Sequence, residues 1–567
     1  MIYEKYKKDF WALLTLGIFF ILYCLVFWGR WGDVMVDCPR ELYIPERLSD
    51  GQALYTGIFS LYSPLGYYLN AFFVKIFGNS LNLFYLLGCI NTGIILTIVY
   101  LISRCFSKQI LSFGVSLVVL CYCCISYSPI TNYFFPYSYS VVYALTCFLA
   151  SVYSLILYFK TDFKSKYILF SCLLGGLCIS FKFEFAPALL PLLAVLVVEE
   201  KSLGKIFSGI LCFILAPVLP FLANVDGIKV FADNFFAFCS SPSSKEFFKT
   251  LSIKTPKAYV ISTVKDILAF IVLFVPTLFV LFKSENMTKP KKIGAYILCF
   301  LFLYGGSVFI FDKKIYLFSW LTLVSLWFIV KYFKSEKNDF NFLTFILSMI
   351  LFLSSLRVGG YLASNHYGKY YLPLFLIVFF CLYLPQILKK YYNEKYISFV
   401  LILFSLFNFC FCIFSVNQGK NYRIDTDKGT IYATYSVGKT VEQTAKYIAD
   451  NSSEQDRVLV LPEGLMVNYL SNRKSDDMFY QLLPNHIEIL GEDNIVEKMK
   501  QNPSEYVVLT SLTTTAYGKT YFCADYAFKI CDFINENYEY LETFENKERF
   551  LSNRPGFMMM VLKLKKF

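Results

Sequence analysis

Charged side chains gather in the stretch VMVDCPRELYIPERLSDGQALY, residues 34–55, directly after the first long apolar run of the chain. Asp37, Arg40 and Glu41 lie close together there, around Pro39. A positioned carboxylate can act as a general base, which typically accelerates a reaction by about 10²–10⁴-fold. The structural alternative is a helix opened by Pro39, with Asp37 at its N-terminus and a solvated face of surface pairs worth about 0–1 kcal/mol. Three further charges are expected to lie on the surface: Glu46, Arg47 and Asp50.

A second set of polar residues interrupts later apolar runs. Lys182 and Glu184 lie in FKFEF, and Arg357, His366 and Lys369 lie in RVGGYLASNHYGKYYLP. Ionised side chains near membrane depth cost about 2.5–3.5 kcal/mol each, so they usually face a cavity. The structural alternatives are snorkelling for Lys182 beside Glu184, a hydrogen-bonded structural role for His366, and interfacial anchoring for Arg357 and Lys369. Together with the first loop, the set predicts a lateral cavity with one base and several cations around a lipid-borne phosphate.

The composition identifies the kind of protein that must position these residues. Of the 567 residues, 57% are hydrophobic, 19% aromatic and 17% charged, and the mean hydropathy is +0.53. These values exclude a water-soluble globular protein and indicate a multi-pass helical membrane protein. The net charge of +12 comes from short Lys and Arg clusters between apolar runs, which is the positive-inside pattern and argues against a nucleic-acid partner.

The apolar runs predict about thirteen transmembrane helices, since a span needs about 20 residues. The basic clusters fall at the even-numbered exits, so we expect an uncleaved first span and a cytoplasmic N-terminus in the plasma membrane. The predicted spans are 10–28, 81–102, 110–127, 138–159, 167–181, 185–198, 206–223, 259–282, 293–311, 315–333, 342–356, 370–388 and 396–415.

The chain divides into a predicted transmembrane domain, 1–416, and an extracytoplasmic tail, 417–567. Two outer loops, 29–80 and 224–258, contain aromatic segments that suit the membrane interface. In the tail, RVLVLPEG, EYVVLTSL and FMMMVLKLK predict strands, and VGKTVEQTAKYIADN and ADYAFKICDFINENY predict helices. The tail is therefore predicted to be a small α/β domain. Its LPEG, residues 461–464, is interpreted as a turn, with the lining of an acceptor groove as the alternative.

The cysteines predict no redox chemistry. Most of the 18 lie inside apolar runs, where they act as small hydrophobic residues. Cys523 and Cys531 lie eight apart on a predicted helix, a distance of roughly 12 Å, which predicts no disulfide between them.

The order of features in the first loop, VDCPRELYIPERLSDGQALYTGIFSLYSPLGYYLNAFFVKIFG, resembles that of the GT-C class of integral-membrane glycosyltransferases. This class includes protein O-mannosyltransferases and the lipid A aminoarabinose transferase, which use polyprenyl-phosphate-linked sugars. About thirteen spans followed by an outer α/β domain also resembles their architecture. The resemblance implies that Asp37 is the catalytic base, with Arg40 and Glu41 beside it. Two positions depart from the family pattern: Cys38 and Pro39 follow Asp37 in place of a second acid, and Ser63 replaces a Gly.

The resemblance implies an inverting transfer from a polyprenyl-phosphate donor to a lipid, glycan or protein acceptor, in contact with membrane lipids. Asp37 would deprotonate the acceptor, and the predicted donor-binding residues are Lys182, Glu184, Arg357, His366 and Lys369. No cofactor is required. A divalent metal could bind through Asp37 and Glu41, but the loop lacks a set of oxygen ligands and no metal site is predicted. The alternatives are a flippase or transporter, a polymerase or ligase of lipid-linked glycans, and a non-catalytic scaffold.

Overall fold

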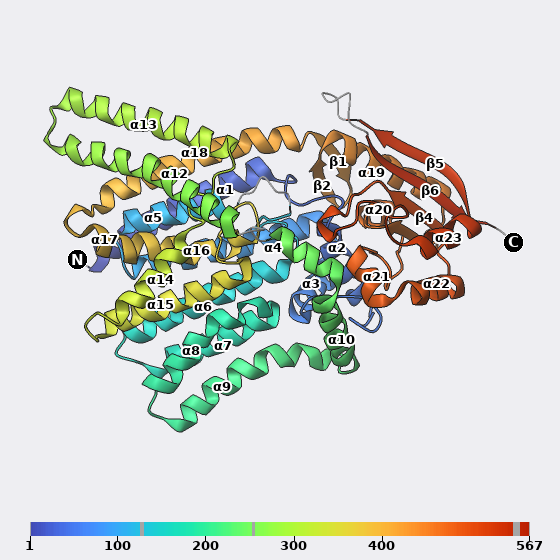
Figure 1. The fold of residues 1–567 in the computed structure, drawn as a ribbon, viewed down its shortest axis with the longest axis horizontal. Coiled ribbons are helices and arrows are strands. Elements are labelled where there is room, and N and C mark those ends of the chain that lie inside the picture. Colours follow the sequence, from blue (N-terminus) through green and yellow to red (C-terminus); the bar gives the residue numbers. More distant parts are fainter. Residues whose placement is uncertain (1, 125–129, 252–255, 548–555, 566–567) are drawn as a thin grey trace.

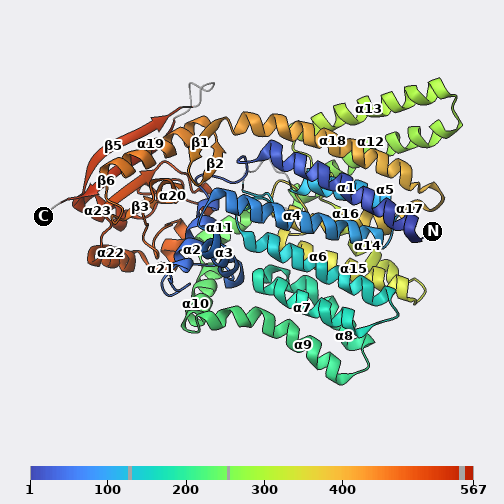
Figure 2. The same cartoon turned by 180° about the vertical axis from the view of Figure 1, so that it is seen from behind.

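The computed structural model describes residues 2–124, 130–251, 256–547 and 556–565. A bundle of long helices forms one end of the molecule, and a C-terminal α/β region, residues 420–565, forms the other (Figure 1). The N-terminus lies at the end of the bundle that is far from this region, and the view from behind shows the same arrangement (Figure 2). The predicted division into an apolar bundle followed by a mixed α/β region is therefore present in the structure.

Each of the predicted spans forms helix within the described residues. Nine helical stretches there are long and apolar enough to cross a membrane, whereas the runs at 110–127, 167–181, 185–198 and 315–333 give shorter helices. The bundle consists of α1 (Ile2–Phe27), α4 (Leu81–Arg104), α5 (Gln109–Val118), α6 (Tyr139–Lys160), α7 (Ser165–Phe181), α8 (Ala186–Glu199), α9 (Leu203–Val218), α12 (Pro256–Lys283), α13 (Lys289–Asp312), α14 (Leu321–Tyr332), α15 (Asp339–Ser355), α16 (Leu372–Val378), α17 (Leu384–Leu388) and α18 (Glu394–Gly419).

Four amphipathic helices lie between the bundle and the C-terminal α/β region (Figure 2). They are α2 (Cys38–Ser49) and α3 (Pro64–Phe77) from the first outer loop, and α10 (Asp226–Ser240) and α11 (Pro242–Leu251) from the second. Pro39 and Pro64 lie in the first turns of α2 and α3, where the missing N–H of proline costs no helical hydrogen bond. Both aromatic loop segments therefore fold as short helices at the predicted positions.

The C-terminal α/β region is built on a four-stranded sheet in the order β3-β4-β6-β5. β3 (Val458–Leu461) pairs parallel with β4 (Tyr506–Thr510), and β6 (Phe557–Leu564) pairs antiparallel with both β4 and β5 (Tyr538–Asn546). The fully buried strand β3 reads VLVL, the continuous apolar pattern of a strand covered on both faces. The other elements are the hairpin β1 (Tyr422–Thr426) and β2 (Gly429–Ala433), and the helices α19 (Tyr435–Asn451), α20 (Met466–Ser471), α21 (Pro484–Leu490), α22 (Glu492–Gln501) and α23 (Phe528–Asn537).

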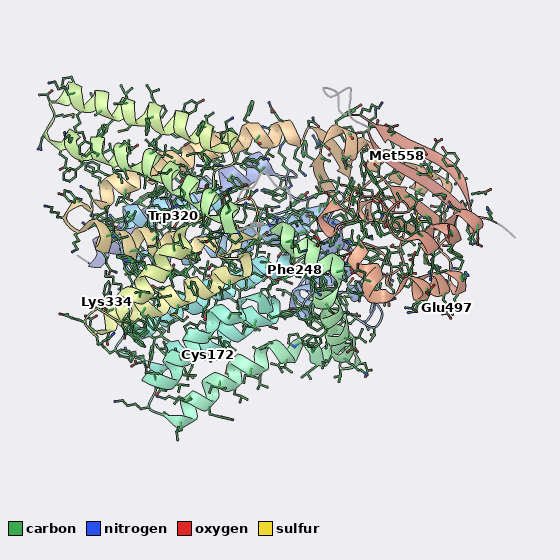
Figure 3. The ribbon with its side chains drawn as sticks, in the orientation of Figure 1. Cys172, Phe248, Trp320, Lys334, Glu497 and Met558 are labelled. Atoms are coloured by element: carbon green, nitrogen blue, oxygen red, sulfur yellow. A yellow bond between two sulfur atoms is a disulfide. The ribbon has the colours of Figure 1, made fainter. Side chains whose placement is uncertain are left out.

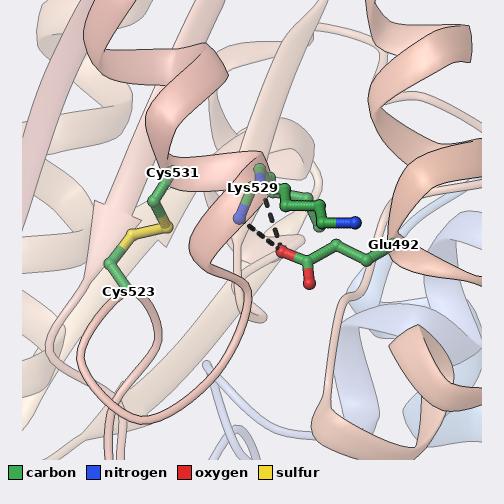
Figure 4. Close-up of a disulfide and its surroundings, with 5 residues drawn as sticks. Glu492, Cys523, Lys529 and Cys531 are labelled. Atoms are coloured by element: carbon green, nitrogen blue, oxygen red, sulfur yellow. Dashed lines mark hydrogen bonds between the residues drawn. A yellow bond between two sulfur atoms is a disulfide. The ribbon is translucent and has the colours of Figure 1, made fainter.

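The prediction of no disulfide in this region was wrong. Cys523 and Cys531 are bonded, with their Cα atoms 5.6 Å apart (Figure 4). The reason is that α23 begins only at Phe528, after Ala527 in the left-handed conformation, so Cys523 lies on a loop that turns back toward the helix. The separation of roughly 12 Å expected for Cys523 and Cys531 assumed one continuous helix, and the two residues do not lie on one. Glu492 accepts hydrogen bonds from the backbone N–H groups of Lys529 and Ile530, which satisfies donors at the start of α23.

Candidate functional site

A cavity of about 380 Å³ lies where the bundle, the two outer loops and the C-terminal α/β region meet. It gathers most of the residues that the sequence singled out. We call its two sides the bundle wall and the C-terminal wall. The first loop contributes Asp37 and Arg40; the bundle wall consists of Lys182, Glu184, Arg357 and His366; and the C-terminal wall consists of Glu463, Gln481, Asn485 and His486.

Asp37 lies at the N-cap position of α2 but does not cap the helix with its side chain. Instead, the Arg40 Nη1 donates a hydrogen bond of 2.8 Å to Asp37 Oδ1, and the Asp37 side chain keeps 19% of its surface exposed at the cavity. The backbone of Asp37 has a φ of 60° and a ψ of −56°, and the N–H of Cys38 donates to the carbonyl of Val36 at 2.6 Å, so Asp37 is the central residue of a γ-turn of the rare, strained kind. Strain of this kind persists only where surrounding contacts hold it.

Arg40 and Glu41 connect α2 to the start of α6 by hydrogen bonds. The Arg40 Nη2 donates to the carbonyl of Tyr137 at 2.9 Å, and the backbone N–H of Tyr139 donates to Glu41 Oε2 at 2.9 Å. Glu41 is fully buried behind the cavity wall and does not line the cavity. Burial raises the pKa of Glu41 to about 7, although Arg40 and the Tyr139 N–H oppose the rise. The geometry therefore gives Glu41 a place supporting Arg40 rather than a place beside a substrate.

The bundle wall holds a compact charged group. Arg357 Nε lies 3.1 Å from Glu184 Oε1, and Lys182 Nζ lies 4.7 Å from the centre of the Tyr62 ring. The guanidinium of Arg40 lies on the same Tyr62 ring at 4.6 Å, so this ring brings the Asp37–Arg40 pair and Lys182 to one place. Burial alone would raise the pKa of Glu184, but Lys182 and Arg357 outweigh it and hold that pKa below its usual value.

Lys182 is buried in the wall of the cavity and does not reach solvent as a snorkelling lysine would. Burial lowers the pKa of Lys182, with Glu184 opposing the shift. His366 also lines the cavity, and its Nδ1 accepts a hydrogen bond from the N–H of Tyr367 at 3.0 Å. Burial, with a smaller contribution from Arg357, lowers the pKa of His366, which favours its neutral form.

Lys369 is the predicted donor-binding residue that the cavity does not include. It is fully buried, and its carbonyl accepts a hydrogen bond from the Tyr133 hydroxyl at 2.6 Å. The physical reason is local: the short 3-10 turn Tyr367–Tyr370 directs Tyr367 to the cavity and buries Lys369 in the bundle. We therefore leave Lys369 out of the proposed phosphate site.

The C-terminal wall contains an acid that we did not select from the sequence. Glu463, in the LPEG turn after β3, accepts a hydrogen bond from the backbone N–H of Asp37 through its Oε1 at 2.9 Å. Burial and the nearby charge of Asp37 raise the pKa of Glu463 to about 8. The only sign of Glu463 in the sequence was an acid in a turn at the end of a predicted strand. Its hydrogen-bond partner, Asp37, lies 426 residues away, and no local sequence pattern reveals such a contact.

Arg47 corrects a second expectation, because it is not a surface residue. Its Nε lies 2.9 Å from Asp477 Oδ1, and its side chain is only 8% exposed. The Tyr43 hydroxyl donates to the same Asp477 oxygen at 2.7 Å. Asp50, in contrast, is exposed as expected and pairs with Arg47 at 2.7 Å. The second half of α2 is thus a docking surface for the C-terminal α/β region.

Aromatic side chains surround the charged groups of the cavity. Tyr62, Tyr137 and Tyr367 line it on the bundle side, and Tyr480 and Tyr517 line it on the C-terminal side. Phe247 of α11 stacks on Tyr517 with ring centres 4.9 Å apart, and the neighbouring Phe248 lies at the junction of the two regions (Figure 3). An apolar surround with a few placed polar groups is typical of a small-molecule site and strengthens the electrostatic interactions inside it.

A divalent metal does not fit the groups that are present. Among the residues that the structure describes, no three or more His, Cys, Asp or Glu side chains are grouped to hold a metal ion. The two acids considered for this role also face different partners, since Asp37 pairs with Arg40 and Glu41 accepts from Tyr139. We therefore derive no step through a metal.

The matched family model is described as dolichyl-phosphate-mannose-protein mannosyltransferase and covers residues 62–223. The matched part includes Tyr62, Lys182 and Glu184 and begins after Asp37. None of the curated proteins compared with the chain matches it significantly in sequence.

Solved structures of three proteins are distantly similar to the chain. The Archaeoglobus fulgidus oligosaccharyltransferase in complex with Zn and sulfate is 10% identical, with a TM-score of 0.49 over 88% of this chain and 68% of that chain. ArnT from Cupriavidus metallidurans bound to undecaprenyl phosphate is 10% identical, with a TM-score of 0.47 over 97% and 98%. Arabinofuranosyltransferase AftD from Mycobacteria is 11% identical, with a TM-score of 0.45 over 98% and 40%. At these values we transfer no residue role.

Proposed function

We propose that this chain, which its family match identifies as a membrane glycosyltransferase, moves a sugar from a polyprenyl-phosphate donor to a hydroxyl or amine acceptor. The family match confirms the class of enzyme predicted from the first loop. The observation that carries the proposal is a single cavity in which Lys182, one member of the charged group with Glu184 and Arg357, lies on the Tyr62 ring. Arg40, which is hydrogen-bonded to the Asp37 carboxylate, lies on the same ring.

The proposed reaction is a single displacement at the anomeric carbon of the donor. The acceptor oxygen or nitrogen forms the new bond, Asp37 takes the acceptor proton, and the carbon–oxygen bond to the phosphate breaks with inversion. The phosphate oxygen keeps the electron pair and leaves as polyprenyl phosphate. One carboxylate is sufficient for this route, whereas a retaining mechanism of the glycosidase kind needs two about 5–5.5 Å apart, one of them a nucleophile.

The bundle wall is the proposed site of the donor phosphate. Two cations, Lys182 and Arg357, and one carboxylate, Glu184, leave a net charge of +1 when all three are ionised. The Asp37–Arg40 pair adds no net charge. A preorganised positive group in a buried aromatic site stabilises the charge that develops on a departing phosphate more strongly than water does. His366, with its lowered pKa, would contribute a neutral hydrogen-bonding group.

The proposed topology places this chemistry on the outer face of the plasma membrane. The basic clusters that follow α4, α6, α8, α12, α14 and α17 would face the cytoplasm, and the cavity and the C-terminal α/β region would lie outside. The four shorter helices would complete thirteen crossings in a GT-C arrangement, with a transmembrane domain over 1–416 and an extracytoplasmic domain over 417–567. The acceptor would be a lipid, glycan or protein.

The direct test uses the full chain reconstituted in lipid with a series of polyprenyl-phosphate sugars. We expect the wild type to transfer one sugar and Asp37→Asn to lose transfer by about 10²–10⁴-fold while it still folds and binds donor. Thermal unfolding of the purified variant checks the fold. A fully active Asp37→Asn protein would remove Asp37 as the base.

The sugar and acceptor are to be identified from a strain that lacks the gene. Mass spectrometry of its lipids and surface glycans should show the loss of one sugar substituent and accumulation of the unmodified acceptor. An accumulated lipid-linked sugar that is not translocated would favour a flippase. Shortened glycan chains on an intact lipid carrier would favour a polymerase or ligase.

A further inference from the structure

We propose that Glu463 of the C-terminal α/β region is a positioning residue that helps to hold Asp37 in its strained γ-turn conformation, and thereby directs the Asp37 carboxylate to the acceptor. This inference rests on the proposed role of Asp37 as the base. Its central observation is the hydrogen bond of 2.9 Å from the Asp37 N–H to Glu463 Oε1, which joins the base to a region 426 residues away.

The conformation of Asp37 explains why such a contact is needed. At the N-cap position of a helix, the side-chain oxygen of an aspartate usually accepts a hydrogen bond from a backbone N–H in the first turn of that helix. Here φ is 60°, no side-chain capping bond forms, and the side chain turns to Arg40 instead. The N–H of Cys38 donates to the carbonyl of Val36 at 2.6 Å and closes this turn locally. Because the turn is strained for a non-glycine residue, it persists only where surrounding contacts add to that bond. Glu463 supplies such a contact at the peptide N–H of Asp37, and Arg40 supplies one at its carboxylate.

The position of Glu463 is itself set firmly by the fold. It follows the fully buried strand β3, and the carbonyl of Pro462 accepts from the N–H of Leu482 at 2.8 Å. The next residue is Gly464, where an added Cβ would lie 2.5 Å from Val460 Cγ1 and 3.3 Å from Met35 Cε. A side chain at Gly464 would therefore clash with strand β3 itself, so the glycine allows the tight LPEG turn that carries Glu463.

Glu463 does not have the properties of a second ionised catalytic acid. Glu463 is only 5% exposed to solvent. Its burial and the nearby charge of Asp37 raise its pKa to about 8. Arg40 opposes this rise, and Asp33 adds to it more weakly. At neutral pH the carboxyl is mostly protonated, and its carbonyl oxygen still accepts from the Asp37 N–H. A glutamine at this position would present the same acceptor without any ionisable proton.

Three substitutions separate the reach of the side chain from its charge. Glu463→Gln keeps both reach and acceptor, Glu463→Asp keeps the acid but is one methylene shorter, and Glu463→Ala loses both. We expect kcat to fall in the order Gln, Asp, Ala, with Gln close to wild type. For Ala we expect a loss on the order of 10²-fold, the size associated with misplacement of a catalytic group by about 1 Å. The KM for the donor should stay unchanged, because the donor phosphate site lies on the bundle wall.

The experiment measures kcat, donor KM and thermal unfolding for these variants beside wild type, Asp37→Asn and the control Glu497→Ala. Glu497 is an exposed glutamate on α22, away from the cavity (Figure 3). Retention of activity by Asp but not by Gln would overturn the proposal in favour of an acid–base role. Equal kcat for Gln and Ala, both folded, would also overturn it. Full activity of Asp37→Asn would instead refute the proposed function, so the two failures are distinguishable.

Discussion

The two walls of the cavity differ in charge and in origin. The bundle wall carries one charged group from two places in the chain: Lys182 and Glu184 lie in the short segment between α7 and α8, and Arg357 lies in the 3-10 turn after α15. The C-terminal wall is polar but essentially uncharged, because burial raises the pKa of Glu463 to about 8 and lowers the pKa of His486 to about 4. A charged wall suits the donor phosphate, and an uncharged polar wall suits the hydroxyl groups of an acceptor.

The contrast also suits Asp37 to the proposed role of a base that serves two substrates. Asp37 lies between the walls, with its carboxylate bonded to Arg40 of the first loop and its N–H bonded to Glu463 of the C-terminal wall. The position of the proposed base therefore depends on both regions of the chain. Variants on the bundle wall should affect the donor, and variants at the contacts with the C-terminal α/β region should affect the position of α2.

The difference between the two walls predicts its largest effect for Lys182, whose replacement should weaken donor binding. Hydrogen bonds to charged groups contribute about 1.5–3 kcal/mol, so Lys182→Ala should weaken donor binding by roughly 10–100-fold. Titration of the reconstituted protein with polyprenyl phosphate measures this directly. The matched control is Lys334→Ala, an exposed lysine at the far end of the bundle (Figure 3). Unchanged affinity in the Lys182 variant would mean that the bundle wall does not hold the phosphate.

The bundle wall could be predicted from sequence because ionised residues between apolar runs are conspicuous. Lys182, Glu184, Arg357 and His366 stand out in this way, and the structure brings all four to one cavity. Lys369 also lies between apolar runs in the sequence, but the structure buries it outside the cavity. Packing, and not hydropathy, decides which side of a short turn a residue faces.

The C-terminal wall could not be predicted in this way, because its residues look like those of any soluble α/β region. Glu463 resembles a turn residue, and Arg47 and Asp477 resemble surface charges, until the two regions dock. Strands β3, β4 and β6 and helices α19 and α23 followed from hydrophobic periodicity, whereas β1, β2 and β5 were not predicted. Contacts between positions 37 and 463, or 47 and 477, leave no local pattern. The left-handed turn at Ala527 that allows the disulfide was also missed, because alanine is not a residue type that indicates a positive φ.

A smaller effect is expected at the docking surface of α2. Arg47→Ala removes the pair with Asp477 and leaves that acid with the Tyr43 hydroxyl, so we expect the free energy of unfolding to fall by about 1–3 kcal/mol. Donor affinity should not change, because Arg47 does not line the cavity. Asp50→Ala, which removes only the exposed partner of Arg47, should cost about 0–1 kcal/mol. A loss of donor affinity in the Arg47 variant would contradict the separation of the two regions.

The last effect appears only on acidification and tests whether the C-terminal wall is uncharged. His486 is buried, and its Nδ1 lies 3.0 Å from the Gln481 carbonyl. Burial lowers its pKa from 6.5 to about 4 in the folded protein, so the unfolded chain binds a proton more readily. Stability contributed by the neutral ring is therefore complete above about pH 6.5 and is lost as the pH falls toward 4, with a slope of up to about 1.4 kcal/mol per pH unit. Denaturant unfolding from pH 7 to 4 should show this slope in the wild type and a reduced slope in His486→Gln. Equal slopes in the two proteins would mean that the ring takes up a proton as readily in the folded state as in the unfolded state. The C-terminal wall would then gain a positive charge below about pH 6.5.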